Sequence, residues 1–122
     1  MVAVPLHPLL VEARAANRRY RAAEDAVTEV LRSSRLTTAR CLVLEALDRS
    51  AVGLSISQLS RFLGVHRTSV NSAVDKLLAA GMIEKLDNPH DGRASLVRLL
   101  PSGSVALSEA RGLLSRVGAP ND

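Results

Sequence analysis

The feature that most constrains the fold is a pair of short helical segments joined by a tight turn at Gly64. Ser55 and Gln58, three residues apart, predict a capping box at the start of the first segment. Two helices that cross at about 90–120° need a small residue where they meet, here Ser60, and a turn residue that tolerates a positive φ, here Gly64. We therefore expect a helix-turn-helix over residues 56–75.

The outward face of the second helix, expected from about residue 67 to residue 80, is polar near its N-terminus. Arg67 can bind guanine O6 and N7, Asn71 can bind adenine, and Thr68 can contact a thymine methyl group. The alternative is a solvated polar face, with Thr68 acting as a helix cap. We expect Arg61 and Lys76 to bind phosphate. His66, just before the helix, either binds phosphate or fills the turn. The candidate DNA-binding residues of the helix-turn-helix are Arg61, His66, Arg67, Thr68, Ser69, Asn71, Ser72 and Lys76.

The hydrophobic period changes after residue 81. Residues 82–86 and 95–99 are predicted to form short strands, and residues 87–93 between them are rich in turn formers. A helix-turn-helix followed by a β-hairpin is a winged-helix layout, in which a basic wing tip reaches phosphate or the minor groove. His90 and Arg93 are the candidates at this tip. The alternative for Arg93 is an ion pair with an aspartate of the same loop.

A long helix is expected from about residue 8 to residue 33. Its apolar residues step alternately by four and three, as in a coiled-coil seam. At 1.5 Å per residue it is roughly 37 Å long, more than a small domain covers. We expect part of the stripe to pack against a second chain, and the alternative is a core helix within one monomer. The stripe consists of Leu9, Ala13, Ala16, Tyr20, Ala23, Val27 and Val30.

These patterns predict a mainly α fold with a small β-hairpin wing, a winged helix-turn-helix with terminal dimerisation helices. Another helix, starting at Thr37 or Thr38, precedes the helix-turn-helix, and a last one opens at Pro101. In the last helix, Leu113 and Leu114 are expected to join the dimer interface. The expected segments are a dimerisation helix over 1–35, the winged domain over 36–100, and a dimerisation helix with a tail over 101–122.

Composition excludes several classes of protein. Aromatic residues make up only 2% of the chain, which argues against nucleic-acid readers that stack bases on aromatic rings. The net charge of +4 is modest, but residues 49–74 contain no acidic residue. The sequence has no phosphate-binding loop, nucleophile elbow or metal-ligand spacing, so we expect neither an enzyme nor a cofactor or metal.

The single cysteine, Cys41, is flanked by Leu42 and Val43. One cysteine excludes an intrachain disulfide, and we expect Cys41 to be a buried packing residue rather than a redox sensor. No apolar run is long enough to span a bilayer, and the N-terminus does not have the pattern of a secretory signal. We therefore expect a cytoplasmic protein with no membrane partner.

Several short motifs follow one another between about residues 36 and 103. Their order and spacing resemble those of the MarR-type transcriptional regulators, and Asp91-Gly92-Arg93 resembles the Asp-x-Arg signature of that family's wing. The other motifs are Leu36-Thr37, Val43-Leu44, Leu59, Leu63-Gly64-Val65, Thr68-Ser69-Val70, Leu77, Gly81-Met82-Ile83-Glu84-Lys85, Val97-x-Leu99 and Pro101-Ser102-Gly103.

The resemblance implies a homodimer held by the terminal helices, with a recognition helix in the major groove and the wing arginine in or near the minor groove. It also implies that a small molecule or a redox signal often regulates the protein. Ser72 stands where many relatives carry arginine, and Cys41 where an aromatic residue is common. Because the sequence ends about twenty residues after Gly103, whereas relatives usually have a longer C-terminal helical region, we expect the first helix to carry more of the dimer interface.

The predicted function is sequence-specific binding to double-stranded DNA by a homodimeric transcriptional regulator, a repressor on a palindromic operator. The expected partners are double-stranded DNA, a second copy of the chain and an unidentified small-molecule effector. Two alternatives stay open: a winged helix used for protein–protein assembly, and a non-specific architectural DNA binder.

Overall fold

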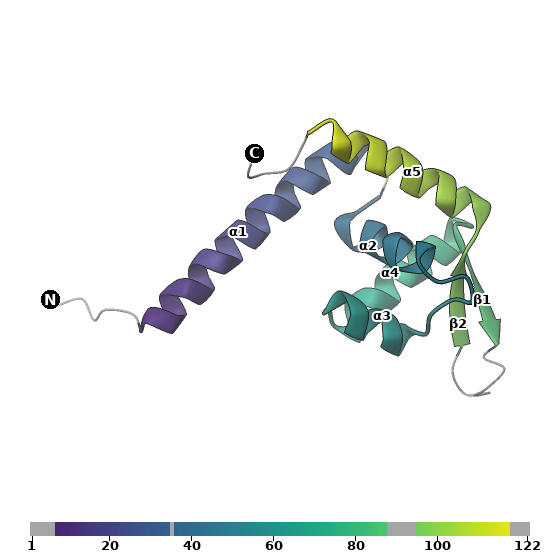
Figure 1. The fold of residues 1–122 in the computed structure, drawn as a ribbon, viewed down its shortest axis with the longest axis horizontal. Helices are drawn as coiled ribbons and strands as arrows, with labels where there is room; N and C mark the ends of the chain where they lie inside the picture. Colours follow the sequence, from purple (N-terminus) through teal and green to yellow (C-terminus); the bar gives the residue numbers. More distant parts are fainter. Residues whose placement is uncertain (1–6, 35, 88–94, 118–122) are drawn as a thin grey trace, which may run out of the picture.

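The computed structural model describes residues 7–34, 36–87 and 95–117. Five α-helices and one β-hairpin follow one another in the order that the sequence predicts (Figure 1). A short 3-10 helix, Arg32–Ser34, follows the first helix. The elements are α1 (Pro8–Leu31), α2 (Thr38–Asp48), α3 (Ile56–Leu63), α4 (Arg67–Ala79), β1 (Ile83–Asp87), β2 (Ser95–Leu99) and α5 (Pro101–Ser115).

Local capping explains where the helices begin. The side chain of Thr37 accepts a hydrogen bond from the Arg40 backbone amide at 3.2 Å and so caps α2. Ser55 and Gln58 form the predicted capping box at the start of α3, with bonds of 2.9 and 3.1 Å. Proline occupies the first position of both α1 and α5, where its missing N–H costs nothing.

The hydrophobic core surrounds α2, which packs against α4, α5, α3, β2 and α1. Leu44 and Leu47 of α2 are fully buried. They meet fully buried leucines from three other helices, Leu59 of α3, Leu77 of α4 and Leu107 of α5. One contiguous core therefore holds the helix-turn-helix and the C-terminal helix together.

The wing is an antiparallel pair in which Ile83 lies opposite Leu99. Its first strand begins at Ile83, one residue later than the pattern predicts, because the amide of Met82 still donates to the Leu77 carbonyl at the end of α4. Leu54, in the loop before α3, forms an isolated bridge with Val97 of the second strand. Strand β2 therefore pairs with β1 on one edge and with Leu54 on the other.

The predicted wing-tip residues His90 and Arg93 lie outside the described residues, and so do the tail beyond residue 117 and the first six residues. In the part of the chain that the structure describes, no helix is both long enough and apolar enough to cross a membrane.

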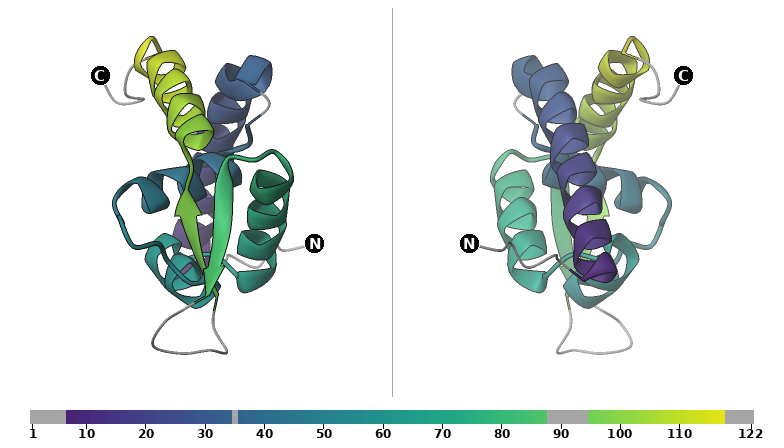
Figure 2. Two further views of the ribbon diagram at one scale, coloured as in Figure 1. Left: turned by 90° about the vertical axis from the view of Figure 1, so that its right-hand side faces the viewer. Right: turned by 90° about the vertical axis from the view of Figure 1, so that its left-hand side faces the viewer.

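Helix α1 extends away from the winged domain, and its last turns diverge from α5 as the arms of a V (Figure 2). Leu31, at its C-terminal end, is fully buried, and Val27 packs partly against the core. Leu9 and Tyr20, further toward the N-terminus, are 69% and 59% exposed. The monomer therefore covers only the C-terminal end of the α1 stripe.

A matched pair of glycines in α5 tests how tightly this helix packs on the wing. A Cβ atom at Gly103 would overlap the Met82 carbonyl oxygen and lie 2.8 Å from Leu99 Cδ1, whereas one at Gly112 would meet open space. We expect Gly103→Ala to lower the free energy of unfolding by about 1–3 kcal/mol in urea titrations. Gly112→Ala should raise it by about 0.5–1 kcal/mol, because alanine is the better helix former. Equal effects of the two substitutions would contradict the packing described.

Candidate nucleic-acid interface

The turn between α3 and α4 is fixed by Gly64 and Ser60. Gly64 has φ +67° and ψ 31°, a left-handed conformation that glycine adopts without strain. The amides of Gly64 and Val65 both donate to the Ser60 carbonyl oxygen, at 2.9 and 3.2 Å. The Ser60 hydroxyl in turn donates to the Val65 carbonyl oxygen at 2.5 Å. Ser60 is therefore more than a small residue at the crossing, since its side chain also closes the turn.

The helix-turn-helix buries one side of α4. Val70, Ala73, Val74 and Leu77 are buried, and Leu78, which the pattern also assigned to the core, is half-buried. The opposite side of the helix is therefore available to a partner along its whole length.

Helical geometry orders the exposed residues of α4. Successive residues turn by about 100°, so Thr68, Ser72 and Asp75 point most directly away from the buried side. Arg67 and Asn71 share the flank on the side of α3, and the Arg67 side chain does contact α3. The N-terminal half of α4 thus presents hydroxyl, amide and guanidinium groups, and the first acidic side chain comes at Asp75.

Every described candidate residue for DNA contact is exposed. Exposure agrees with a reading surface, although a solvated face would be exposed too. These residues are Arg61, His66, Arg67, Thr68, Ser69, Asn71, Ser72 and Lys76.

The N-cap residue of α2 and one residue of its first turn lie beside this face, although the sequence gives no reason to place them there. Thr37 and Arg40, from the start of α2, line a shallow hollow together with Thr68, Ser69 and Ser72 of α4. The contact joins segments about thirty residues apart and depends on how α2 packs on α4, so no local pattern could have shown it. The exposed face of α4 is therefore bordered by the N-terminal end of α2.

Three acidic residues of α2 and the wing are paired with arginines. Glu45 and Asp48 of α2 both bind Arg111 of α5, at 2.9 and 3.2 Å. Glu84 of the wing forms an ion pair with Arg98 across the hairpin. This pairing, with the lack of acids between residues 49 and 74, leaves the start of α4 with an excess of positive charge.

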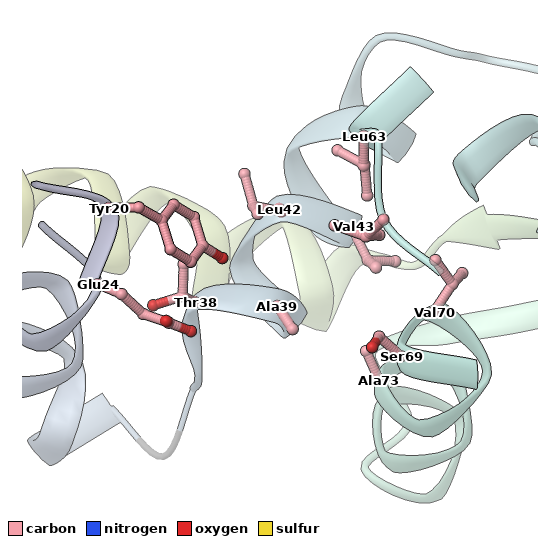
Figure 3. Close-up of a pocket in the computed structure, with 11 residues that line it drawn as sticks. Tyr20, Glu24, Thr38, Ala39, Leu42, Val43, Leu63, Ser69, Val70 and Ala73 are labelled. Atoms are coloured by element: carbon pink, nitrogen blue, oxygen red, sulfur yellow. The ribbon is translucent and has the colours of Figure 1, made fainter. Parts of the chain in front are cut away.

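A groove of about 140 Å³ runs from α1 over α2 to α4 (Figure 3). Tyr20 and Glu24 come from α1, Leu42 comes from α2, and Ser69 comes from α4. At the α1 end, the buried Oγ1 of Thr38 has no hydrogen-bond partner within the described ranges. The groove therefore has a polar end at α1 and an apolar floor that reaches α4.

The predicted dimerisation residues fall into two groups. Leu9, Ala13, Ala16, Tyr20 and Ala23 are exposed, whereas Val27, Val30, Leu113 and Leu114 are half-buried near the junction of α1 and α5. Only the first group is an apolar surface without cover from the monomer.

Cys41 is buried in α2, at 7% exposure. Burial raises the pKa of its thiol, and the nearby Glu45 carboxylate raises it further, against a smaller opposite effect of Arg111. A raised pKa disfavours the reactive thiolate. The environment of Cys41 thus agrees with a packing role.

Known proteins resemble this chain in sequence and in fold. Residues 36–94 match the model of the MarR family. The multiple antibiotic resistance protein MarR of Salmonella typhimurium is 40% identical over 48 residues, which cover 39% of this chain and 33% of that protein. The chain thus matches about a third of the length of this curated relative.

Two solved structures show how far the fold likeness extends. The transcriptional regulator MOSR of Mycobacterium tuberculosis, solved in complex with DNA, has a TM-score of 0.75 at 25% identity, covering 86% of this chain and 75% of that one. Bordetella bronchiseptica BpsR, whose DNA binding is regulated by 6-hydroxynicotinic acid, has a TM-score of 0.81 at 22% identity, covering 93% and 81%. The matched segment runs from just before α2 to the residue before β2, and the fold likeness to BpsR covers 93% of the chain. Over residues 36–94, the chain belongs to the MarR family of winged helix transcriptional regulators.

Proposed function

We propose that this chain is a homodimeric, sequence-specific DNA-binding regulator that represses transcription from a palindromic operator. The observation that carries the proposal is the exposed N-terminal half of α4, where guanidinium, hydroxyl and amide side chains stand on a surface without acidic residues. The DNA complex of MOSR supports it, because that relative combines the same fold with DNA binding.

In this mechanism, phosphate contacts position the domain and base contacts give specificity. Arg61, His66 and Lys76 bind phosphates, together with His90 and Arg93 of the wing. The base-reading residues are Arg67, Thr68 and Asn71. Ser69 and Ser72 are small, which lets α4 lie deep in the major groove.

A second copy of the chain is the occupant that fits the exposed part of the α1 stripe. The stripe keeps its coiled-coil spacing beyond the point where the monomer stops covering it, and Leu9 and Tyr20 are among its most exposed members. Two copies related by a two-fold axis would present their α4 helices to half-sites about one helical turn apart.

The first test is selection from a random pool of DNA duplexes. We expect the wild-type chain to enrich a palindrome, and Arg67→Ala or Asn71→Ala to relax the preference at one base pair per half-site by about 1–3 kcal/mol. Lys76→Ala should weaken binding to all duplexes alike and reduce the salt dependence by about one unit of slope. Arg116→Ala, a loss of the same charge at the end of α5, serves as the control.

The alternatives give different results in the same selection. An architectural binder would retain the whole pool evenly. A protein–protein assembly module would retain none of it above background, and either result would overturn the proposed specificity.

A matched pair of substitutions in α1 tests the dimer. Ala16 lies on the stripe and Ala22 lies about 120° away around the same helix, and both are exposed in the monomer. Because an unpaired charge in an apolar interface is costly, we expect Ala16→Arg to weaken dimerisation about tenfold or more. Ala22→Arg should leave the chain sedimenting at twice its 13.0 kDa mass. If both variants stay dimeric, the interface lies elsewhere.

We further propose that a small molecule in the groove between α1 and α4 controls DNA binding. A cavity of roughly this size holds one benzene-sized ring. A ligand there would touch the dimerisation helix and the recognition helix at once. The regulation of BpsR DNA binding by 6-hydroxynicotinic acid supports control by a small molecule. Glu24 favours a neutral or cationic ligand over an anionic one.

Phenol, benzylamine and 6-hydroxynicotinic acid probe the groove with neutral, cationic and anionic groups. We expect the first two to raise the melting temperature more than the third does, and to change the affinity for the selected duplex. Leu42→Arg, which fills the apolar floor, should abolish both effects, whereas Val105→Arg, an equivalent change at an exposed residue of α5, should not. Equal responses of the two variants would exclude the groove as the site.

A further inference from the structure

One hydrogen bond joins the first turns of α3 and α4. Nη2 of Arg67, the first residue of α4, donates to the hydroxyl oxygen of Ser57, the second residue of α3, at 2.6 Å. Arg67 is exposed and Ser57 is half-buried. The bond therefore holds the long, flexible side chain of Arg67 against Ser57, a half-buried residue of α3.

Hydrogen bonds hold the backbone on both sides of this contact. The capping box of Ser55 and Gln58 closes the first turn of α3 around Ser57. The Ser60 contacts with the turn set the crossing of α3 and α4, and with it the distance from Ser57 to the start of α4. The position of the guanidinium is thus determined by the helix-turn-helix itself.

Holding this side chain in place matters for base recognition. A free arginine samples many rotamers and loses that freedom when it binds a base edge. The bond to Ser57 restricts the Arg67 side chain before DNA binds, so less conformational entropy is lost on binding. It also fixes the direction from which the guanidinium approaches the base. The bond uses one N–H of the guanidinium, and the remaining donors stay available for guanine.

We propose that Ser57 is a positioning residue that determines how strictly Arg67 discriminates between base pairs. This inference rests on the proposed function, because it assigns Ser57 a role only if Arg67 reads DNA. Ser57 carries no charge, so its contribution is to orientation and not to the electrostatic attraction of phosphate.

The test measures affinities of the full chain for the duplex enriched from the random pool and for duplexes substituted at each half-site base pair. The variants are Ser57→Ala, Ser57→Thr, Arg67→Ala and the Ser57→Ala/Arg67→Ala double variant. Ser108→Ala, the same chemical change at an exposed position of α5, is the control. Circular dichroism melts verify that each variant is folded.

We expect Ser57→Ala to reduce discrimination about two- to tenfold at the base pair that Arg67 reads, with other positions and the salt slope unchanged. Ser57→Thr keeps the hydroxyl and should restore the wild-type preference. In the Arg67→Ala background, removing the Ser57 hydroxyl should have no further effect, because the side chain that it positions is gone.

The remaining outcomes separate this inference from the proposed function. If Arg67→Ala leaves discrimination unchanged, Arg67 does not read DNA, and its assigned role and the inference both fail. If Arg67→Ala relaxes discrimination but Ser57→Ala does not, the inference alone is overturned. An equal loss of affinity from Ser57→Ala with and without Arg67 would also overturn it, because Ser57 would then contact the DNA backbone itself.

Discussion

The structure depends on the burial of α2. Its apolar residues fill the centre of the domain, and the recognition helix, the C-terminal helix, the wing and the end of α1 all pack on it. Close-packed interiors deform little, so a shift of one helix on α2 is passed to the others. This helix is the physical link between the surfaces assigned to dimerisation and to DNA. The groove between α1 and α4 crosses it, which places any occupant on that link.

Local sequence signals were enough to predict the elements, because each boundary depends on residues a few positions apart. The capping box at Ser55 and the glycine turn at Gly64 are found as predicted, and Gly64 has a positive φ. Contacts between distant segments could not be predicted in this way. The bond from Arg67 to Ser57 and the groove shared by Tyr20 and Thr38 exist only because helices of different orientation meet. The exposed side chains of the reading face were identified from periodicity, but their roles toward DNA remain predictions.

The apolar stripe of α1 is buried at its C-terminal end and exposed toward its N-terminal end. Its C-terminal turns complete the core of the monomer through Leu31, and its N-terminal turns keep the same apolar spacing without cover. A change in how α1 meets α2 would therefore alter the relation between the two copies of α4 in a dimer. In the proposed mechanism, this geometry would couple a ligand in the groove to the spacing of the half-sites without movement inside the helix-turn-helix.

The central claim is that the N-terminal half of α4 lies in the major groove of DNA. Methylation interference on the selected duplex tests it directly, because methylation of guanine N7 blocks contacts from that groove only. We predict interference at guanines in two major-groove segments about one helical turn apart. In Arg67→Ala, the interference at one guanine of each half-site should disappear. Undiminished binding to fully N7-methylated duplex, or interference confined to adenine N3 in the minor groove, would contradict the account.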